Sequence, residues 1–314
     1  MANNVIRWLL SPVRPDQRVG DGALTMLRIV AGLLWLYNVV WKQPPSFGEN
    51  NNGGLYFFTS LGVEHPVFPP FSWIVENMVL PNFGIFGWVT LISETTLAVL
   101  LLTGTFVKLA ALLGIGQSVA IGLSVAVAPH EWPWAYFMMI AIHLALLLAW
   151  STRYLAVDAV RDAAATGDAA PRAASLMRTW GIVLAIVGVL AVALSFTEDL
   201  LASRGGLVGY QPLEVTLGNY NILGALVLLV IGLLLLGGAI TRNAMIAAAA
   251  AALAVLAAAS IYIQNGWSDV WLGGTNTSAA LYLCAAVIAA ASMHYLRQKP
   301  APTRPGSGSG QGEP

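Results

Sequence analysis

Charged residues are scarce in this chain. Asp, Glu, Lys and Arg make up 10% of its 314 residues, whereas soluble domains contain about 25%. Hydrophobic residues make up 57%, and the mean hydropathy is +0.72. A soluble globular domain is therefore excluded. The 15 basic and 15 acidic residues balance, so the sequence gives no reason to expect nucleic acid as a partner.

Cysteine is almost absent. The single residue, Cys284, excludes an intramolecular disulfide, a CxxC redox pair and a cysteine metal cluster. The sequence also lacks a P-loop, a dinucleotide-binding glycine fingerprint and a nucleophile elbow. Of the four histidines, only His143 lies deep within an apolar segment. We therefore expect neither a metal nor a nucleotide cofactor.

Long apolar segments are abundant. Eight of them are long enough to cross a hydrocarbon core of about 30 Å at about 1.5 Å per residue: residues 23–41, 83–104, 107–128, 132–150, 180–196, 221–240, 244–263 and 278–296. Ten-residue segments of alternating hydrophobicity, which would indicate a barrel, are missing. The sequence predicts an all-α integral membrane protein of about eight transmembrane helices, with the lipid bilayer as its main partner.

The basic residues predict the orientation, because Lys and Arg in short loops accumulate on the cytoplasmic side. With eight helices, one side receives only Lys42 and Arg204, and Arg28 lies inside the first span. The other side receives twelve basic residues: Arg7, Arg14, Arg18, Lys108, Arg153, Arg161, Arg172, Arg178, Arg242, Arg297, Lys299 and Arg304. We expect a multi-pass protein of a bacterial plasma membrane with both termini cytoplasmic.

Composition divides the chain into four segments. Residues 1–160 hold the first four helices, and residues 161–179 form a cytoplasmic linker rich in Ala, Arg and Asp. Residues 180–297 hold four further helices, and residues 298–314 form a Gly- and Ser-rich disordered tail. Both halves carry a tryptophan-containing outer loop, so a duplicated four-helix unit is one alternative.

Three ionisable residues lie inside apolar spans, where a charge costs about 2.5–3.5 kcal/mol on insertion scales. They are Arg28, Glu94 and His143. Helix geometry places Glu94 and His143 at similar depth in the membrane. Arg28 lies at a different depth, but its long side chain can cover most of the difference. One interpretation is an ion pair that only holds helices together. The other is a pocket in which Arg28 or Lys42 attracts an anion or a quinone carbonyl, while Glu94 and His143 carry protons.

Asn38, Trp41 and Lys42 lie at the outer end of the first span and are candidate binding residues for a substrate or quinone. The aromatic-rich segment that follows, residues 42–82, is either an interfacial belt or a lid over a pocket.

Short motifs in the first 160 residues are typical of one known family. They are Arg28-Ile29-Val30-Ala31-Gly32, Trp41-Lys42, Ser93-Glu94, Leu100-Leu101-Leu102-Thr103-Gly104 and Lys108-Leu109-Ala110-Ala111. In these motifs the chain resembles the DoxX/DoxD family, which includes the small membrane subunit of thiosulfate:quinone oxidoreductase. The resemblance implies a four-helix membrane unit with functional Arg, Lys and Glu residues at Arg28, Lys42 and Glu94. The last four helices lie outside it.

The resemblance implies a membrane oxidoreductase subunit that passes electrons from a small sulfur compound, thiosulfate, to membrane quinone. Quinone is then the expected cofactor, as substrate or bound lipid, and other redox subunits are possible partners. Two alternatives stay open: a noncatalytic scaffold for redox or envelope proteins, and a small-anion transporter.

Overall fold

The structure is a computed structural model that describes residues 17–196, 217–265, 267 and 270–298. These residues form helices and connecting turns without a β-strand. The prediction of an all-α multi-pass membrane protein is confirmed, because seven of the helices are long and apolar enough to cross a bilayer.

The seven helical segments that meet the length requirement are α2 (Gln17–Val39), the continuous run Pro69–Thr103 that ends in α5 (Phe83–Thr103), α6 (Val107–Val125), α9 (Ala169–Leu194), α11 (Ile222–Thr241), α12 (Ala244–Ile263) and α13 (Asn276–Arg297). An eighth apolar helix, α7 (Trp134–Leu148), has only 15 residues. It corresponds to the predicted span 132–150 and is about 22 Å long. It is shorter than predicted because Pro133 precedes its first turn and Ala149 returns to extended backbone.

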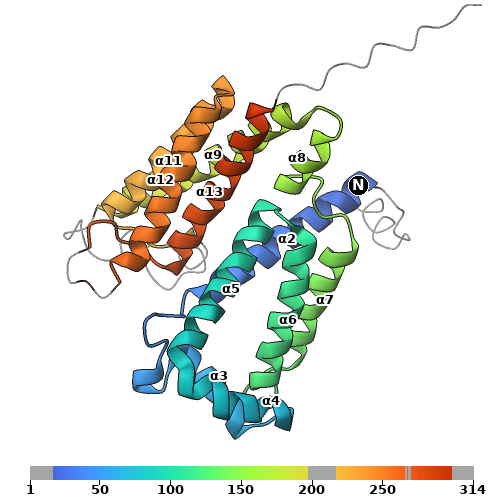
Figure 1. Ribbon diagram of the computed structural model, residues 1–314, viewed down its shortest axis with the longest axis vertical. Helices are drawn as coiled ribbons and strands as arrows, with labels where there is room; N and C mark the ends of the chain where they lie inside the picture. The colour runs from blue at the N-terminus through green and yellow to red at the C-terminus, as the bar shows by residue number, and fades with distance from the viewer. Residues whose placement is uncertain (1–16, 197–216, 266, 268–269, 299–314) are drawn as a thin grey trace, which may run out of the picture.

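The helices form two groups (Figure 1). The first group contains α2, α5, α6 and α7, and the second contains α9, α11, α12 and α13. Helix α13 belongs to both cores, because Ala280, Leu281 and Cys284 pack against residues of α2 and α5. Helix α13 thus contacts both predicted four-helix domains.

The second group packs closely because small residues face one another. A Cβ at Gly232 of α11 would lie 2.6 Å from the backbone nitrogen of Ala185 in α9. The buried face of α12 consists of alanines: Ala247, Ala250, Ala254, Ala257 and Ala258. Such small side chains allow helix backbones to approach closely in membranes, where van der Waals packing holds helices together.

The predicted linker is largely helical. Helix α8 (Val157–Ala164) ends within it, and α9 begins at Ala169, eleven residues before the predicted span at residue 180. Ala169, Ala173 and Leu176 are buried in a small core with Val157 and Val160 of α8. The prediction that residues 161–179 form a surface linker was wrong in this respect, because alanine is also the best helix former.

Residues 49–82, which we call the cap segment, cover one end of the first group, away from α8 (Figure 1). The segment contains η1 (Glu49–Asn51), α3 (Gly54–Glu64), α4 (Pro69–Ile74), η2 (Val75–Val79) and η3 (Leu80–Asn82). Phe47, just before it, is buried between Gly87 and Trp88 of α5. Phe47 thus packs onto α5, whereas Phe68 and Trp73 of the cap segment are exposed.

The beginning of α2 and the end of α13 lie at the same end of the molecule as α8 (Figure 1). This arrangement agrees with an even number of crossings. Which end faces the cytoplasm stays a prediction. Five of the basic residues used to predict it (Arg7, Arg14, Arg204, Lys299 and Arg304) and almost all of the predicted tail lie outside the described residues.

Arg28 closes the α8 end of the first group. Its Nη1 donates to the carbonyl oxygens of Leu101 and Leu102 at 2.6 and 3.3 Å. Nη2 donates to Tyr154 and Leu155 at 3.1 and 3.0 Å, and Nε donates to Ser151 at 3.2 Å. A guanidinium has five N–H donors, so all of them have a backbone acceptor. Arg28 therefore ties the last turn of α5 to the loop before α8.

We predict that Arg28→Lys destabilises the protein, because an ammonium group cannot reach five carbonyl oxygens placed around a planar fork. Each buried carbonyl left without a donor costs about 1–3 kcal/mol. Thermal unfolding in detergent micelles should show a Tm several degrees below that of the parent. Arg178→Lys on the exposed face of α9 is the control and should leave the Tm unchanged. Equal Tm values for both variants would contradict this role of Arg28.

Candidate functional site

A cavity of about 670 Å³ lies inside the first helix group. Its walls come from α2, α5, α6 and α7, and from the cap segment. Most lining residues are apolar, including Leu34, Phe58, Phe86, Ile121 and Met139. Ligand pockets in proteins typically have volumes of about 300–1,000 Å³, apolar walls and a few polar groups. The cavity has the size and character of a binding site for a small amphiphile.

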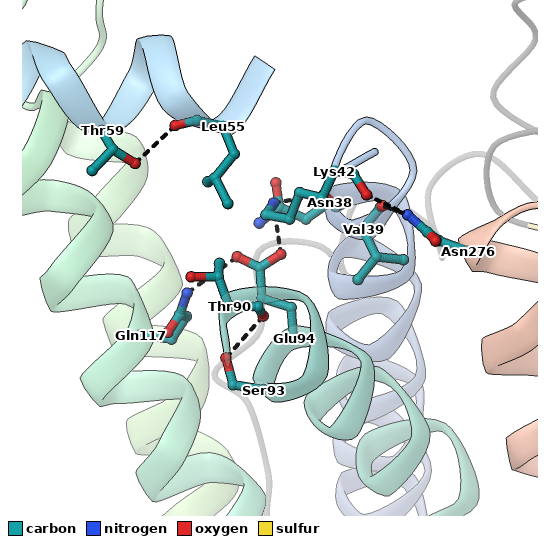
Figure 2. Close-up of polar contacts among 10 residues, drawn as sticks. All are labelled: Asn38, Val39, Lys42, Leu55, Thr59, Thr90, Ser93, Glu94, Gln117 and Asn276. Carbon is teal, nitrogen blue, oxygen red and sulfur yellow. Dashed lines mark hydrogen bonds and ion pairs between the residues drawn. The ribbon is translucent and has the colours of Figure 1, made fainter. Parts of the chain in front are cut away.

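A buried ion pair forms the polar corner of this cavity (Figure 2). The Nζ atom of Lys42 lies 2.6 Å from Oε2 of Glu94, and each side chain is only 1% exposed. Glu94 comes from the middle of α5, and Lys42 follows the end of α2. In a low-dielectric setting, burying an isolated charge would cost several kcal/mol. The opposite charge of the partner offsets this cost for both Lys42 and Glu94.

Three further contacts fix Lys42. Its Nζ donates to the carbonyl oxygen of Asn38 at 2.8 Å, and it lies 3.7 Å from the centroid of the Trp41 ring. The Asn276 amide of α13 donates to the carbonyl oxygens of Val39 and Lys42 at 2.9 and 2.6 Å (Figure 2). The second helix group thus holds the turn that presents the lysine.

Gln117 of α6 completes the polar corner. Its Nε2 donates to Oε1 of Glu94 at 3.1 Å, so both carboxylate oxygens of Glu94 have a partner. Gln117 is half-buried and lines the cavity, whereas Glu94 is almost fully covered. Ser93 and Thr90, one turn apart on α5, line the same corner (Figure 2).

His143 of α7 lines the cavity and is hydrogen-bonded at both ring nitrogens. Nε2 accepts the indole N–H of Trp35 at 2.9 Å, and Nδ1 lies 2.7 Å from the carbonyl oxygen of Met139. A Cβ at Gly114 of α6 would lie 2.1 Å from the ring, so glycine there makes room for the imidazole. His143 therefore joins α2 to α7 and fits tightly against α6.

The cap segment closes the cavity at its other end. Leu55 and Phe58 of α3, Phe71 of α4 and Val75 of η2 contribute to the lining. Of the two alternatives for the aromatic segment, a belt or a lid, Phe58 and Phe71 match the lid, whereas Phe68 and Trp73 are exposed as in a belt. Beside the cap segment, Tyr136 donates to Oε2 of Glu131 at 2.5 Å, and both residues line the cavity.

Five of the six predicted site residues line this cavity: Asn38, Trp41, Lys42, Glu94 and His143. Arg28 does not. The expectation that it would meet Glu94 and His143 was wrong, because its five donors are used by backbone carbonyls at the α8 end of the group. Lys42 takes its place as the partner of Glu94. His143 lies in the same cavity but is bonded to Trp35 and not to Glu94.

Sequence reasoning missed Gln117, Glu131 and Tyr136. Gln117 did leave a signal, since it is an amide inside the apolar span 107–128. Glu131 and Tyr136 left none, because a loop carboxylate and an interfacial tyrosine are ordinary features of a membrane protein.

Comparison of the chain with protein-family models, with curated proteins and with solved structures gives no match. The resemblance to the DoxX/DoxD family therefore stays a prediction.

Proposed function

We propose that this chain is a membrane oxidoreductase subunit that binds a quinone in the cavity of the first helix group. The observation that supports the proposal best is the buried Lys42–Glu94 pair at the polar corner of an otherwise apolar cavity. A quinone combines an apolar tail with a ring that carries hydrogen-bond acceptors. It would fill the apolar part and direct its ring to the polar corner.

Reduction of a quinone consumes two electrons and two protons. Glu94, which is linked to Lys42 and Gln117, would pass protons toward the ring after the ring has bound. The electrons must come from a donor, and the resemblance to the DoxX/DoxD family names a small sulfur compound such as thiosulfate. The expected products are the quinol and the oxidised sulfur compound.

A noncatalytic membrane scaffold is the second candidate. It is favoured by the almost complete burial of Lys42 and Glu94, because a pair covered to this degree joins the end of α2 to α5 without any ligand. The anion-transporter alternative gains no such support, since Glu94 already neutralises Lys42.

We predict that purified protein binds a short-tailed quinone and that binding quenches tryptophan fluorescence, because Trp35 and Trp41 line the cavity. Glu94→Gln removes the charge partner of Lys42 and should weaken binding at least tenfold, or about 1.4 kcal/mol. The control is Glu76→Gln on the exposed face of η2, which should bind like the parent. Absence of saturable quenching in the folded parent would refute quinone binding.

A double-mutant cycle separates a structural from a functional pair. Lys42→Met or Glu94→Leu alone strands one buried charge and should cost about 3–5 kcal/mol of stability. The double variant removes both charges and should recover most of that loss. We expect it to be folded, as judged by Tm and gel filtration, and still unable to bind quinone. Normal quinone binding by the double variant would show that the pair is structural and that other residues hold the quinone.

Membranes that contain the protein should reduce added quinone when thiosulfate is supplied, beyond the rate of membranes without it. We predict that Glu94→Gln lowers this extra rate at least tenfold, about 1.4 kcal/mol of transition-state stabilisation. Glu76→Gln should retain it. The assay follows quinone absorbance, and a rate independent of Glu94 would place the reaction elsewhere.

A further inference from the structure

The cavity holds little positive charge that could attract an anion. Among the described residues that line it, Lys42 is the one Lys or Arg, and Glu94 lies against it at 2.6 Å. The pair has no net charge whether the shared proton lies on nitrogen or on oxygen. Glu131, a second lining carboxylate, can only make the cavity more negative.

His143 adds no positive charge either. An indole N–H can only donate, so the nitrogen that receives it, Nε2, carries no proton. The proton of the ring then lies on Nδ1, which donates to the carbonyl oxygen of Met139. Among the side chains that line the cavity, the sum of charges is therefore zero or negative.

We infer that this cavity accepts an amphiphile with an uncharged head group and excludes small anions, including thiosulfate. The inference rests on the proposed quinone binding and makes it more specific. An anion would enter a low-dielectric site without a compensating cation, which costs several kcal/mol. If an anionic donor supplies the two electrons, it is oxidised outside this cavity at a redox cofactor of a partner subunit, which passes the electrons on to the quinone.

Gln117 is the residue that contacts the head group. Because the Glu94 carboxylate only accepts hydrogen bonds, it holds the Gln117 amide with Nε2 toward itself. The second N–H and Oε1 make no other hydrogen bond within the described part of the chain. A quinone carbonyl can accept from this N–H, and a quinol hydroxyl can donate to Oε1. The amide thus suits both redox forms, and neither Glu94 nor Lys42 needs to be uncovered.

The first test compares two ligands on the full-length protein by tryptophan quenching. One is an alkyl-1,4-naphthoquinone. The other is its 2-hydroxy derivative with the same alkyl tail, which is an anion at neutral pH. We expect the anion to bind at least tenfold more weakly, and millimolar thiosulfate to leave binding of the neutral quinone unchanged.

The outcomes separate the two proposals. Equal affinity for the two naphthoquinones, or displacement of the neutral one by thiosulfate, would overturn the exclusion of anions and leave quinone binding intact. Failure of the neutral quinone to bind would overturn the proposed function as well.

The second test addresses Gln117. Gln117→Met keeps the length of the side chain and removes its amide, and it should weaken binding of the neutral naphthoquinone at least tenfold. The matched control is Gln43→Leu, since Gln43 is exposed and lies outside the cavity. If Gln117→Met does not fold, Gln117→Asn, which shortens the amide, has the same expected loss. Unchanged affinity in a folded variant would overturn the role of Gln117.

Discussion

A bilayer offers no water to hydrogen-bond a polar group, and this constraint decides where each buried charge of the chain lies. A stranded charge or carbonyl costs several kcal/mol, a large part of the stability of any protein. Arg28 and Lys42 satisfy the constraint in different ways. The guanidinium is surrounded by five carbonyl oxygens, whereas the ammonium is matched by one carboxylate and one carbonyl. Only the second arrangement leaves a titratable group beside a cavity.

The same constraint links the two helix groups. The turn at Lys42 lies beyond the end of α2, where helix carbonyls lose their intrahelical donors. Asn276, at the first turn of α13, supplies donors to two of these carbonyls. The ion pair of the first group therefore depends on an asparagine of the second, which gives the last four helices a role at the cavity without placing any lining residue there.

Much of this fold could be predicted from hydropathy. Burying polar groups in lipid costs so much that each span must be apolar over one continuous stretch of the sequence. Span positions agree with the helices at most ends, and five predicted site residues do share a cavity. The partner of Glu94 could not be predicted in this way. Depth along a helix axis places Arg28 within reach of Glu94. It does not reveal that the loop at residues 151–155 offers carbonyl acceptors to Arg28, or that the chain turns Lys42 toward Glu94.

The start of α9 was missed for a different reason. The segment 161–179 is rich in Ala, Arg and Asp, a composition that is typical of a solvated linker. However, three of its residues, Ala169, Ala173 and Leu176, recur at helical spacing and pack against α8. Hydropathy averages over a window and does not respond to such a narrow apolar stripe.

The almost complete burial of the Lys42–Glu94 pair and the openness of the neighbouring cavity are connected. If the Glu94 carboxylate were exposed to a ligand, the ligand would compete with Lys42 for it. Loss of the ion pair would then leave the turn of residues 39–42 free to move. Gln117 removes this conflict, because it is bonded to Glu94 through one N–H and faces the cavity with the rest of its amide. The charged pair thereby determines how a neutral side chain meets the ligand during binding, before Glu94 passes a proton to the ring. In a lipid-embedded site this division of roles keeps the charges paired throughout binding, since only a neutral hydrogen bond has to form or break.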